Sequence, residues 1–87
     1  MWQVTIKKKQ EKGLNKLPVA VRALFKALVQ DLQYDGPELP GWPNYSKLGG
    51  NKYHCHLNYR YVACWTAETK TITIEVYYVG SRENAPY

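Results

Sequence analysis

One amphipathic stretch, residues 17–36 ("LPVAVRALFKALVQDLQYDG"), constrains the fold more than any other part of this sequence. Its apolar side chains recur at helical spacing and form a single stripe, while charged and amide side chains take the opposite side. Pro18 suits the first helical turn, where its missing N–H costs nothing, and Gly36 marks the end. The stripe consists of Leu17, Val21, Leu24, Phe25, Leu28 and Leu32. We therefore predict a helix that buries one stripe and needs a partner surface.

The last third of the chain supplies that surface as strands. "KYHCHL" and "YRYVACW" are separated by little more than Asn58, a residue at home in tight turns, and "AETK" forms a second turn before "TITIEVYYV", which Gly80 ends. Alternation along these runs predicts a three-stranded antiparallel meander with one apolar face. The residues predicted to pack on the helix are Tyr53, Cys55, Leu57, Tyr61, Ala63, Trp65, Ile72, Ile74 and Val76.

The remaining segments complete an α+β arrangement. "WQVTIKKK" alternates as a first strand, and Gly13 then breaks any long helix but leaves room for a short helical turn. Residues 34–51 are rich in Pro and Gly and predict an ordered loop, because Leu39, Trp42 and Tyr45 are costly to leave in water. We expect one domain, residues 1–87, with an N-terminal strand, one or two helices, and a three-stranded antiparallel meander packed on the helix.

Charge and cysteine content narrow the range of partners and compartments. The net charge of +5 favours a polyanionic partner, either nucleic acid or an acidic protein, and less readily an anionic membrane. No apolar run approaches the ~18–20 residues of a spanning helix, and the first residues do not form a secretory signal. Cys55 and Cys64 have opposite parity about the tight turn, so we expect them on opposite faces of the sheet. Two cysteines do not make a disulfide framework, and we expect both thiols to be reduced. We expect a soluble, cytoplasmic protein without membrane contact.

The sheet face opposite the helix carries the chemically active residues. It is expected to show Lys52, His54, His56, Arg60, Val62, Cys64, Glu75 and Tyr77, and Arg82 can fold back toward it. The ordinary interpretation is a solvated face. A metal site would lack a third ligand beside the two imidazoles, and a cysteine nucleophile fails because Cys55 points away, so no metal or other cofactor is expected. The alternative is a single uncovered patch that clasps an RNA backbone.

Two imidazoles and two guanidiniums suffice for RNA cleavage without a metal. Histidine titrates near neutrality and can accept and return a proton, whereas arginine stays charged and holds phosphate oxygens as a fork. One group would remove the ribose 2′-OH proton, arginine would stabilise the phosphorane, and another group would protonate the leaving oxygen. DNA lacks the 2′-OH and would not be a substrate.

Three ordered features resemble the RelE/ParE superfamily of bacterial toxins: "KLP" opening a long helix, "KLGGNKYHCHLNYRYVACW", and "ITIEVYYVGSREN" followed by a final tyrosine. The resemblance covers nearly the whole chain. It implies a RelE-like fold and a ribosome-dependent endoribonuclease that cuts mRNA, held inactive by an acidic antitoxin that wraps around it. It places His54 and His56 where the group often has lysine. The catalytic set that it implies is His54, His56, Arg60, Arg82 and Tyr87.

The resemblance leaves other functions open. ParE-like members share the fold but inhibit DNA gyrase by binding, and an inactive relative would only bind RNA or an antitoxin. Retention of the arginines and imidazoles favours the ribonuclease branch. Candidate RNA contacts are Lys47, Lys52, Trp42 and Tyr45, with Trp42 and Tyr45 either stacking on a nucleobase or covering the core. The lysines between Lys7 and Lys16 form either a solvated face or a contact for rRNA phosphates.

Overall fold

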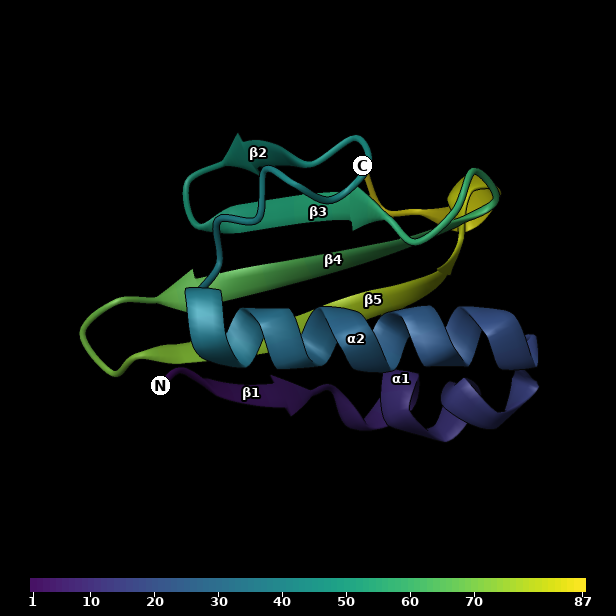
Figure 1. Ribbon diagram of the computed structural model, residues 1–87, viewed down its shortest axis with the longest axis horizontal. Coiled ribbons are helices and arrows are strands. Elements are labelled where there is room, and N and C mark those ends of the chain that lie inside the picture. Colours follow the sequence, from purple (N-terminus) through teal and green to yellow (C-terminus); the bar gives the residue numbers. More distant parts are fainter.

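Five strands and two α-helices make up the computed structural model, which describes all residues 1–87 (Figure 1). The chain runs through β1 (Gln3–Ile6), α1 (Lys8–Gly13), a 3₁₀ turn η1 (Leu14–Lys16) and the long helix α2 (Val19–Asp35). It then forms β2 (Ser46–Gly49), β3 (Lys52–His56), β4 (Tyr61–Glu68), β5 (Thr73–Ser81) and a last 3₁₀ turn η2 (Arg82–Asn84).

The strands form one mixed sheet in the order β1-β5-β4-β3-β2. Strands β2 to β5 pair antiparallel in sequence order, and β1 lies parallel to β5 at the edge, with Val4 opposite Ile74. The α+β class and the meander β3-β4-β5 are as predicted. The prediction of only three strands after the helix was incomplete, because β2 adds a fourth antiparallel strand within the segment that we expected to be a loop.

Helix α2 packs along one face of this sheet, as its apolar stripe predicts (Figure 1). Val21, Phe25, Leu28 and Leu32 are buried in the core, and Leu17 and Leu24 pack against it partly exposed. Pro18 lies one residue before the helix, as its N-cap, and not within the first turn. Its extended backbone still starts the helix at Val19, and Gly36 ends it.

The core lies between α2 and the sheet, with Trp65 of β4 fully buried at its centre. Its ring stacks with Tyr53 and Tyr45 at centroid distances of 6.2 and 6.4 Å, and its indole N–H donates to the carbonyl oxygen of Pro37 at 3.0 Å. Trp42 donates in turn to the Asp31 carboxylate on α2 at 2.8 Å. The proline-rich segment is therefore ordered by core contacts, as expected.

Strand β5 departs from simple alternation because of a β-bulge. The register shifts opposite Cys64 and Trp65, so that Cys64 faces Tyr78 while Trp65 faces Val76. Val79 consequently joins the core, and Tyr78, which simple alternation groups with the core-side residues, takes the outer face. Ile72 was also misplaced: it lies in the turn before β5 with φ 54° and is 49% exposed.

Two strand boundaries also differ from expectation. The Asn58 side-chain oxygen accepts hydrogen bonds from the N–H groups of Arg60 and Tyr61, at 2.8 and 2.9 Å. This turn delays β4 until Tyr61 and leaves Arg60 outside the ladder. At the other end β5 continues through Gly80 to Ser81. Glycine fits at this position because a Cβ on residue 80 would lie only 2.9 Å from the Tyr78 hydroxyl oxygen. None of the helices has the length and apolar character needed to cross a bilayer.

Gly36 is a position where only glycine fits. Its φ of 85° and ψ of −165° lie in a region that other residues almost never occupy. A Cβ there would also lie 2.8 Å from the indole nitrogen of Trp2. We expect Gly36→Ala to lower the free energy of unfolding by about 2 kcal/mol or more, measured by urea denaturation.

Gly13→Ala is the matched control, since Gly13 has an ordinary helical φ of −83° and a Cβ there would have no atom within 4 Å. This control should be neutral or raise the free energy of unfolding by up to about 1 kcal/mol. Equal effects of the two substitutions would contradict the role assigned to Gly36.

Candidate active site

Strand β3 places its side chains alternately in the core and on the outer face of the sheet, the face away from α2. Tyr53 and Cys55 belong to the core, and His54 and His56 lie on the outer face opposite Cys64 and Val62 of β4. The two imidazoles are neighbours, with ring centroids 5.8 Å apart. They are only 7% and 8% exposed, however, so the expectation of an uncovered patch was wrong.

The segment before and within β2 supplies one cover. The Ser46 hydroxyl lies 2.9 Å from Nδ1 of His54, and the Asn44 amide nitrogen lies 3.3 Å from Nδ1 of His56. The His56 backbone N–H also donates to the carbonyl oxygen of Pro43 at 2.8 Å. Each imidazole is therefore held at Nδ1 by a side chain from this segment.

The C-terminal tail, residues 85–87, supplies the second cover. It leaves η2 and ends beside β3, where Figure 1 marks the C-terminus. The Tyr87 ring lies over His54 with centroids 4.4 Å apart, although Tyr87 itself is 53% exposed. Tyr87, His54 and His56 thus form one cluster, and the terminal tyrosine is part of it.

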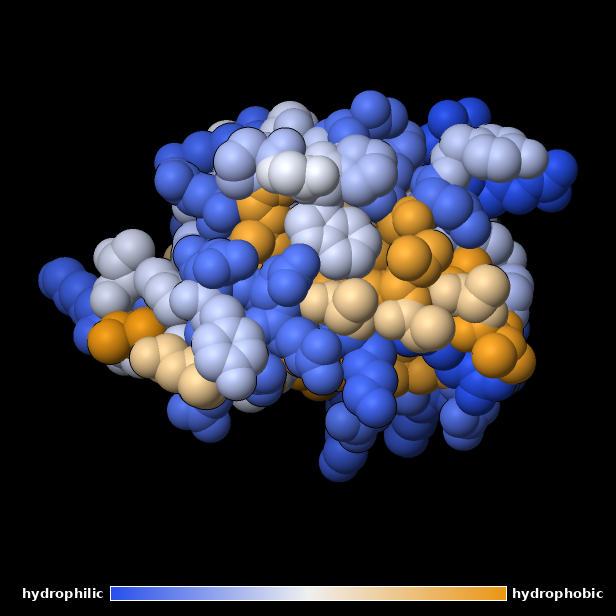
Figure 2. Space-filling model, in the orientation of Figure 1, coloured by the Kyte–Doolittle hydropathy of each residue, from blue (hydrophilic) through white to orange (hydrophobic).

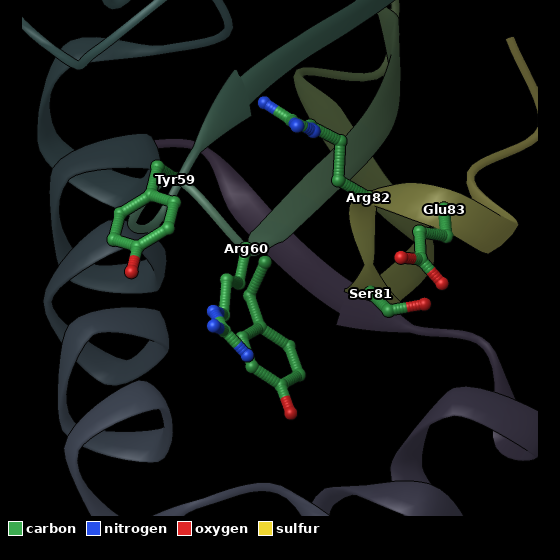
Figure 3. Close-up of a pocket in the computed structure, with 6 residues that line it drawn as sticks. Tyr59, Arg60, Ser81, Arg82 and Glu83 are labelled. Atoms are coloured by element: carbon green, nitrogen blue, oxygen red, sulfur yellow. The ribbon is translucent and has the colours of Figure 1, made fainter.

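Arg82 and Arg60 lie in two neighbouring turns, and the cavity that they line includes neither histidine. The Arg82 backbone N–H donates to the carbonyl oxygen of Arg60 at 2.8 Å, which fixes η2 beside the β3–β4 turn. Between them lies an open cavity of about 410 Å³, lined by Tyr59, Arg60, Tyr61, Ser81, Arg82 and Glu83 (Figure 3). The guanidinium groups of Arg60 and Arg82 point in different directions. Arg82 is the arginine close enough to affect the charge state of His56, whereas Arg60 lies across the Tyr59 ring at 5.7 Å.

The candidate RNA contacts do not gather with the histidines. The Nζ atom of Lys47 lies 5.6 Å from the centroid of the Tyr53 ring, on the core side of the sheet edge. The Nζ atom of Lys52 lies 6.0 Å from the centroid of the Tyr77 ring, on the outer face. Trp42 and Tyr45 pack against the core. Of these four residues, only Lys52 shares a face with His54 and His56.

Burial sets the charge state of the imidazoles. Burial lowers the pKa of His54, opposed by a hydrogen bond to the Ser46 backbone and assisted by the neighbouring His56. Burial also lowers the pKa of His56, and the positive charge of Arg82 adds to that effect. Both rings are therefore biased toward the neutral form, which can accept a proton.

The other ionisable groups of the cluster are held in their protonated forms. Burial raises the pKa of the Cys55 thiol to about 12 and of the Cys64 thiol to about 11. Both cysteines are free and lie on opposite faces of the sheet, as predicted. Burial also raises the pKa of Tyr87, with Cys64 acting in the same sense and Arg82 opposing. No three His, Cys, Asp or Glu side chains are arranged as metal ligands.

Asn44, Ser46 and Tyr78 were missed from the sequence although they belong to this site. Tyr78 lies on the outer face through the β5 bulge and donates to the Ser81 carbonyl oxygen at 2.7 Å. A signal for the hairpin existed: Gly49 and Gly50, both at positive φ, lie between short runs that pair as β2 and β3. No alternation marks β2, so this pairing was not predicted.

Comparison with solved structures settles the fold. RelE in the RelE–RelB complex of Pyrococcus horikoshii OT3 superposes with a TM-score of 0.77 at 22% identity, covering 97% of this chain and 98% of that one. The isolated Escherichia coli RelE toxin gives 0.74 at 23% identity, covering 99% and 89%. The YoeB–YefM complex of Staphylococcus aureus gives 0.74 at 11% identity, covering 94% and 98%.

The chain has the RelE fold. No protein-family model matches the sequence, and no curated protein sequence matches it. At these identities the likeness to RelE establishes the architecture alone.

The lowered pKa values of His54 and His56 predict a pH-dependent stability. An unfolded histidine titrates near pH ~6.5, and both folded imidazoles titrate below that value. Just below pH ~6.5 the unfolded chain therefore binds more protons than the folded chain, and the free energy of unfolding falls as the pH drops. The urea midpoint should decrease between about pH 7.5 and about pH 5.5.

The double variant His54→Gln, His56→Gln is the control for this slope. It should lose part of the pH dependence in this window whatever its absolute stability, because the imidazoles are gone. A wild-type midpoint that stays level or rises on acidification would show that the rings are not held neutral in the folded protein.

Proposed function

We propose that this protein is a metal-independent endoribonuclease that cleaves mRNA on the ribosome and acts as the toxin of a toxin–antitoxin pair. The observation that supports the proposal most strongly is the cluster of Tyr87, His54 and His56 on one face of a RelE fold, with the positive charge of Arg82 near His56. His54 and His56 are neighbours at 5.8 Å, Tyr87 lies against His54, and Arg82 acts on His56.

The proposed reaction is transfer of the phosphodiester to the ribose 2′ oxygen. One imidazole removes the 2′-OH proton, the 2′ oxygen attacks phosphorus, and the 5′ oxygen leaves with a proton from a second donor. The products are a 2′,3′-cyclic phosphate and a 5′-OH end. Arg82 stabilises the charge of the phosphorane, and Arg60 holds the RNA chain beside the cavity. The protonated Tyr87 phenol is the second donor in this scheme.

Access of RNA to His54 requires the tail to move. Residues 85–87 have no helix or strand structure, and the Tyr87 ring lies directly on His54. The segment is held by the Tyr87 ring contact and by a hydrogen bond from the Ala85 N–H to the Arg82 carbonyl oxygen at 3.3 Å, so few contacts oppose its movement. In this scheme the tail shifts when RNA binds and keeps Tyr87 within reach of the leaving oxygen.

The proposed protein partner is an acidic antitoxin. Figure 2 shows apolar residues gathered over α2, where Ala20, Ala23 and Ala27 are exposed and Leu24 is partly exposed. The exposed cations Arg22 and Lys26 border this stripe. An amphipathic acidic segment would match both features. RelE and YoeB each occur in complex with a second protein, RelB and YefM, in the similar structures.

A non-enzymatic gyrase inhibitor is the second candidate. One observation favours it: the imidazoles are only 7% and 8% exposed, which limits their contact with a substrate. Inhibition of supercoiling by the purified protein, without any cleavage of mRNA on programmed ribosomes, would select this function. An inactive relative would show neither effect.

Arg82 provides the direct test of the nuclease. Arg82→Ala removes the charge that stabilises the phosphorane and should lower single-turnover cleavage on programmed ribosomes by about 10²-fold. Arg82→Lys should recover part of this loss, because the charge returns without the fork. Arg60→Ala should mainly weaken RNA binding. Growth arrest on expression should follow the cleavage rates.

Arg22→Ala is the matched control, since Arg22 is an exposed arginine on α2. It should cut mRNA at the wild-type rate. If folded Arg82→Ala and Arg60→Ala proteins both cleave as fast as wild type, the catalytic site lies elsewhere.

A further inference from the structure

The two imidazoles of the cluster have chemically different partners at Nδ1. Nδ1 of His56 lies 3.3 Å from the amide nitrogen of Asn44. Nδ1 of His54 lies 2.9 Å from the Ser46 hydroxyl, and the nearby Ser46 backbone acts to raise the pKa of His54. A ring nitrogen either carries a proton or accepts one, so a partner that can only donate excludes a proton on that nitrogen, whereas a partner that can accept permits one.

At His56 the partner can only donate. An amide NH₂ group has two protons and no available lone pair, so Nδ1 of His56 must accept its hydrogen bond. The proton of neutral His56 then lies on Nε2. A second proton on Nδ1 would face the amide protons, and Arg82 adds positive charge nearby. This environment therefore opposes the imidazolium form of His56 in two ways.

At His54 the partner can accept. The Ser46 hydroxyl has two lone pairs, so it can accept from Nδ1–H of His54 in both the neutral and the protonated ring. The Ser46 backbone acts in the same sense, because it raises the pKa of His54. Nε2 of neutral His54 is then free to take a proton. The resulting cation keeps its Nδ1–H bond, and the neutral ring of His56 adds no charge against it.

The segment that makes both contacts has a defined conformation. Asn44 has a positive φ of 52°, a conformation that asparagine adopts more readily than most residues. Ser46 lies directly opposite His54 in the β2–β3 ladder. The remaining ionisable groups around the rings are Tyr87 of the tail, Cys64 of β4, Tyr78 of β5 and Arg82 of η2. The Nδ1 atoms have Asn44 and Ser46 as their hydrogen-bond partners.

We propose that Asn44 and Ser46 are positioning residues that hold the two imidazoles in opposite neutral tautomers. His54 carries its proton on Nδ1, and its Nε2 is the base of the reaction. His56 carries its proton on Nε2 and donates a hydrogen bond to a phosphate oxygen beside Arg82. The tautomer of His56 follows from a partner that can only donate, and that of His54 from a hydroxyl that can accept, beside a backbone that favours the protonated ring. The division of roles rests on the proposed ribonuclease function.

The proton balance of the step is closed. The 2′-OH proton moves to Nε2 of His54 as the bond from the 2′ oxygen to phosphorus forms. The bond from phosphorus to the 5′ oxygen breaks, and that oxygen takes the Tyr87 phenol proton. The His54 imidazolium then releases its proton to water and Tyr87 regains one, so the site returns to its starting state. His56 keeps its proton throughout.

Long-range ¹H–¹⁵N spectra of the uniformly ¹⁵N-labelled protein test the tautomers without RNA. At about pH 8, where the rings are neutral, we expect Nδ1–H for His54 and Nε2–H for His56. Asn44→Asp replaces the donor by an acceptor and should convert His56 to Nδ1–H. Asn44→Gly permits the same backbone and should leave His56 without a fixed tautomer. Finding one tautomer in both wild-type rings would overturn the proposal.

Cleavage measurements test the roles. Ser46→Ala should weaken the Nδ1–H preference of His54 and lower the single-turnover rate by about 10-fold at saturating RNA, and Ser46→Thr should restore both. Asn44→Asp should lower the rate by a similar factor. A Ser46→Ala protein that matches wild type in spectrum and rate would remove Ser46 from the site.

Failure of this inference differs from failure of the proposed function. If the tautomers are opposite and no variant or wild-type protein cleaves mRNA, the nuclease proposal fails while the tautomers stand. If wild type cleaves but both rings share one tautomer, the nuclease stands and the positioning roles fail.

Discussion

The strict alternation of β3 between two neighbouring strands is the constraint on which the remaining structure depends. Tyr53 and Cys55 enter the core on one side, while His54 and His56 occupy the other side of the same strand. Neither set can shift without the other, because a slip of one residue would place imidazoles in the core. Packing around Trp65 therefore fixes the position of the candidate site, which needs no separate framework of its own.

Most of the fold could be predicted from the periodic spacing of apolar side chains in the sequence. The helical stripe and the alternation of β3 and β4 led to the correct elements, and the parity of Cys55 and Cys64 led to the correct faces. Periodicity failed where long-range contacts decide the conformation. Strand β2 is an edge strand with little apolar pattern, and Tyr78 reached the outer face only through a bulge that alternation does not encode.

For the candidate site, residue types and the shared face of the histidines could be predicted, but their environment could not. Burial of His54 and His56 comes from segments distant in sequence, the turn at Asn44 and the tail at Tyr87. Arg60 also lies elsewhere than predicted. The Asn58 side chain forms a turn with the Arg60 N–H group, and the strand ladder begins only at Tyr61. Such contacts depend on how loops return to the sheet, and no local pattern reports that.

The parallel pairing of β1 with β5 has a consequence for synthesis of the chain. The Thr5 hydroxyl donates a hydrogen bond to the Ile74 carbonyl oxygen, 69 residues away in the sequence. Strand β1 therefore cannot pair until β5 has been synthesised. Contacts of such separation form late in folding. A nascent chain consequently has neither a complete sheet nor the segment that carries Arg82 and Tyr87 until β5 and the residues after it have left the ribosome. Assembly of the cluster thus follows synthesis of β5, η2 and the tail, and fragments that stop before Arg82 lack it.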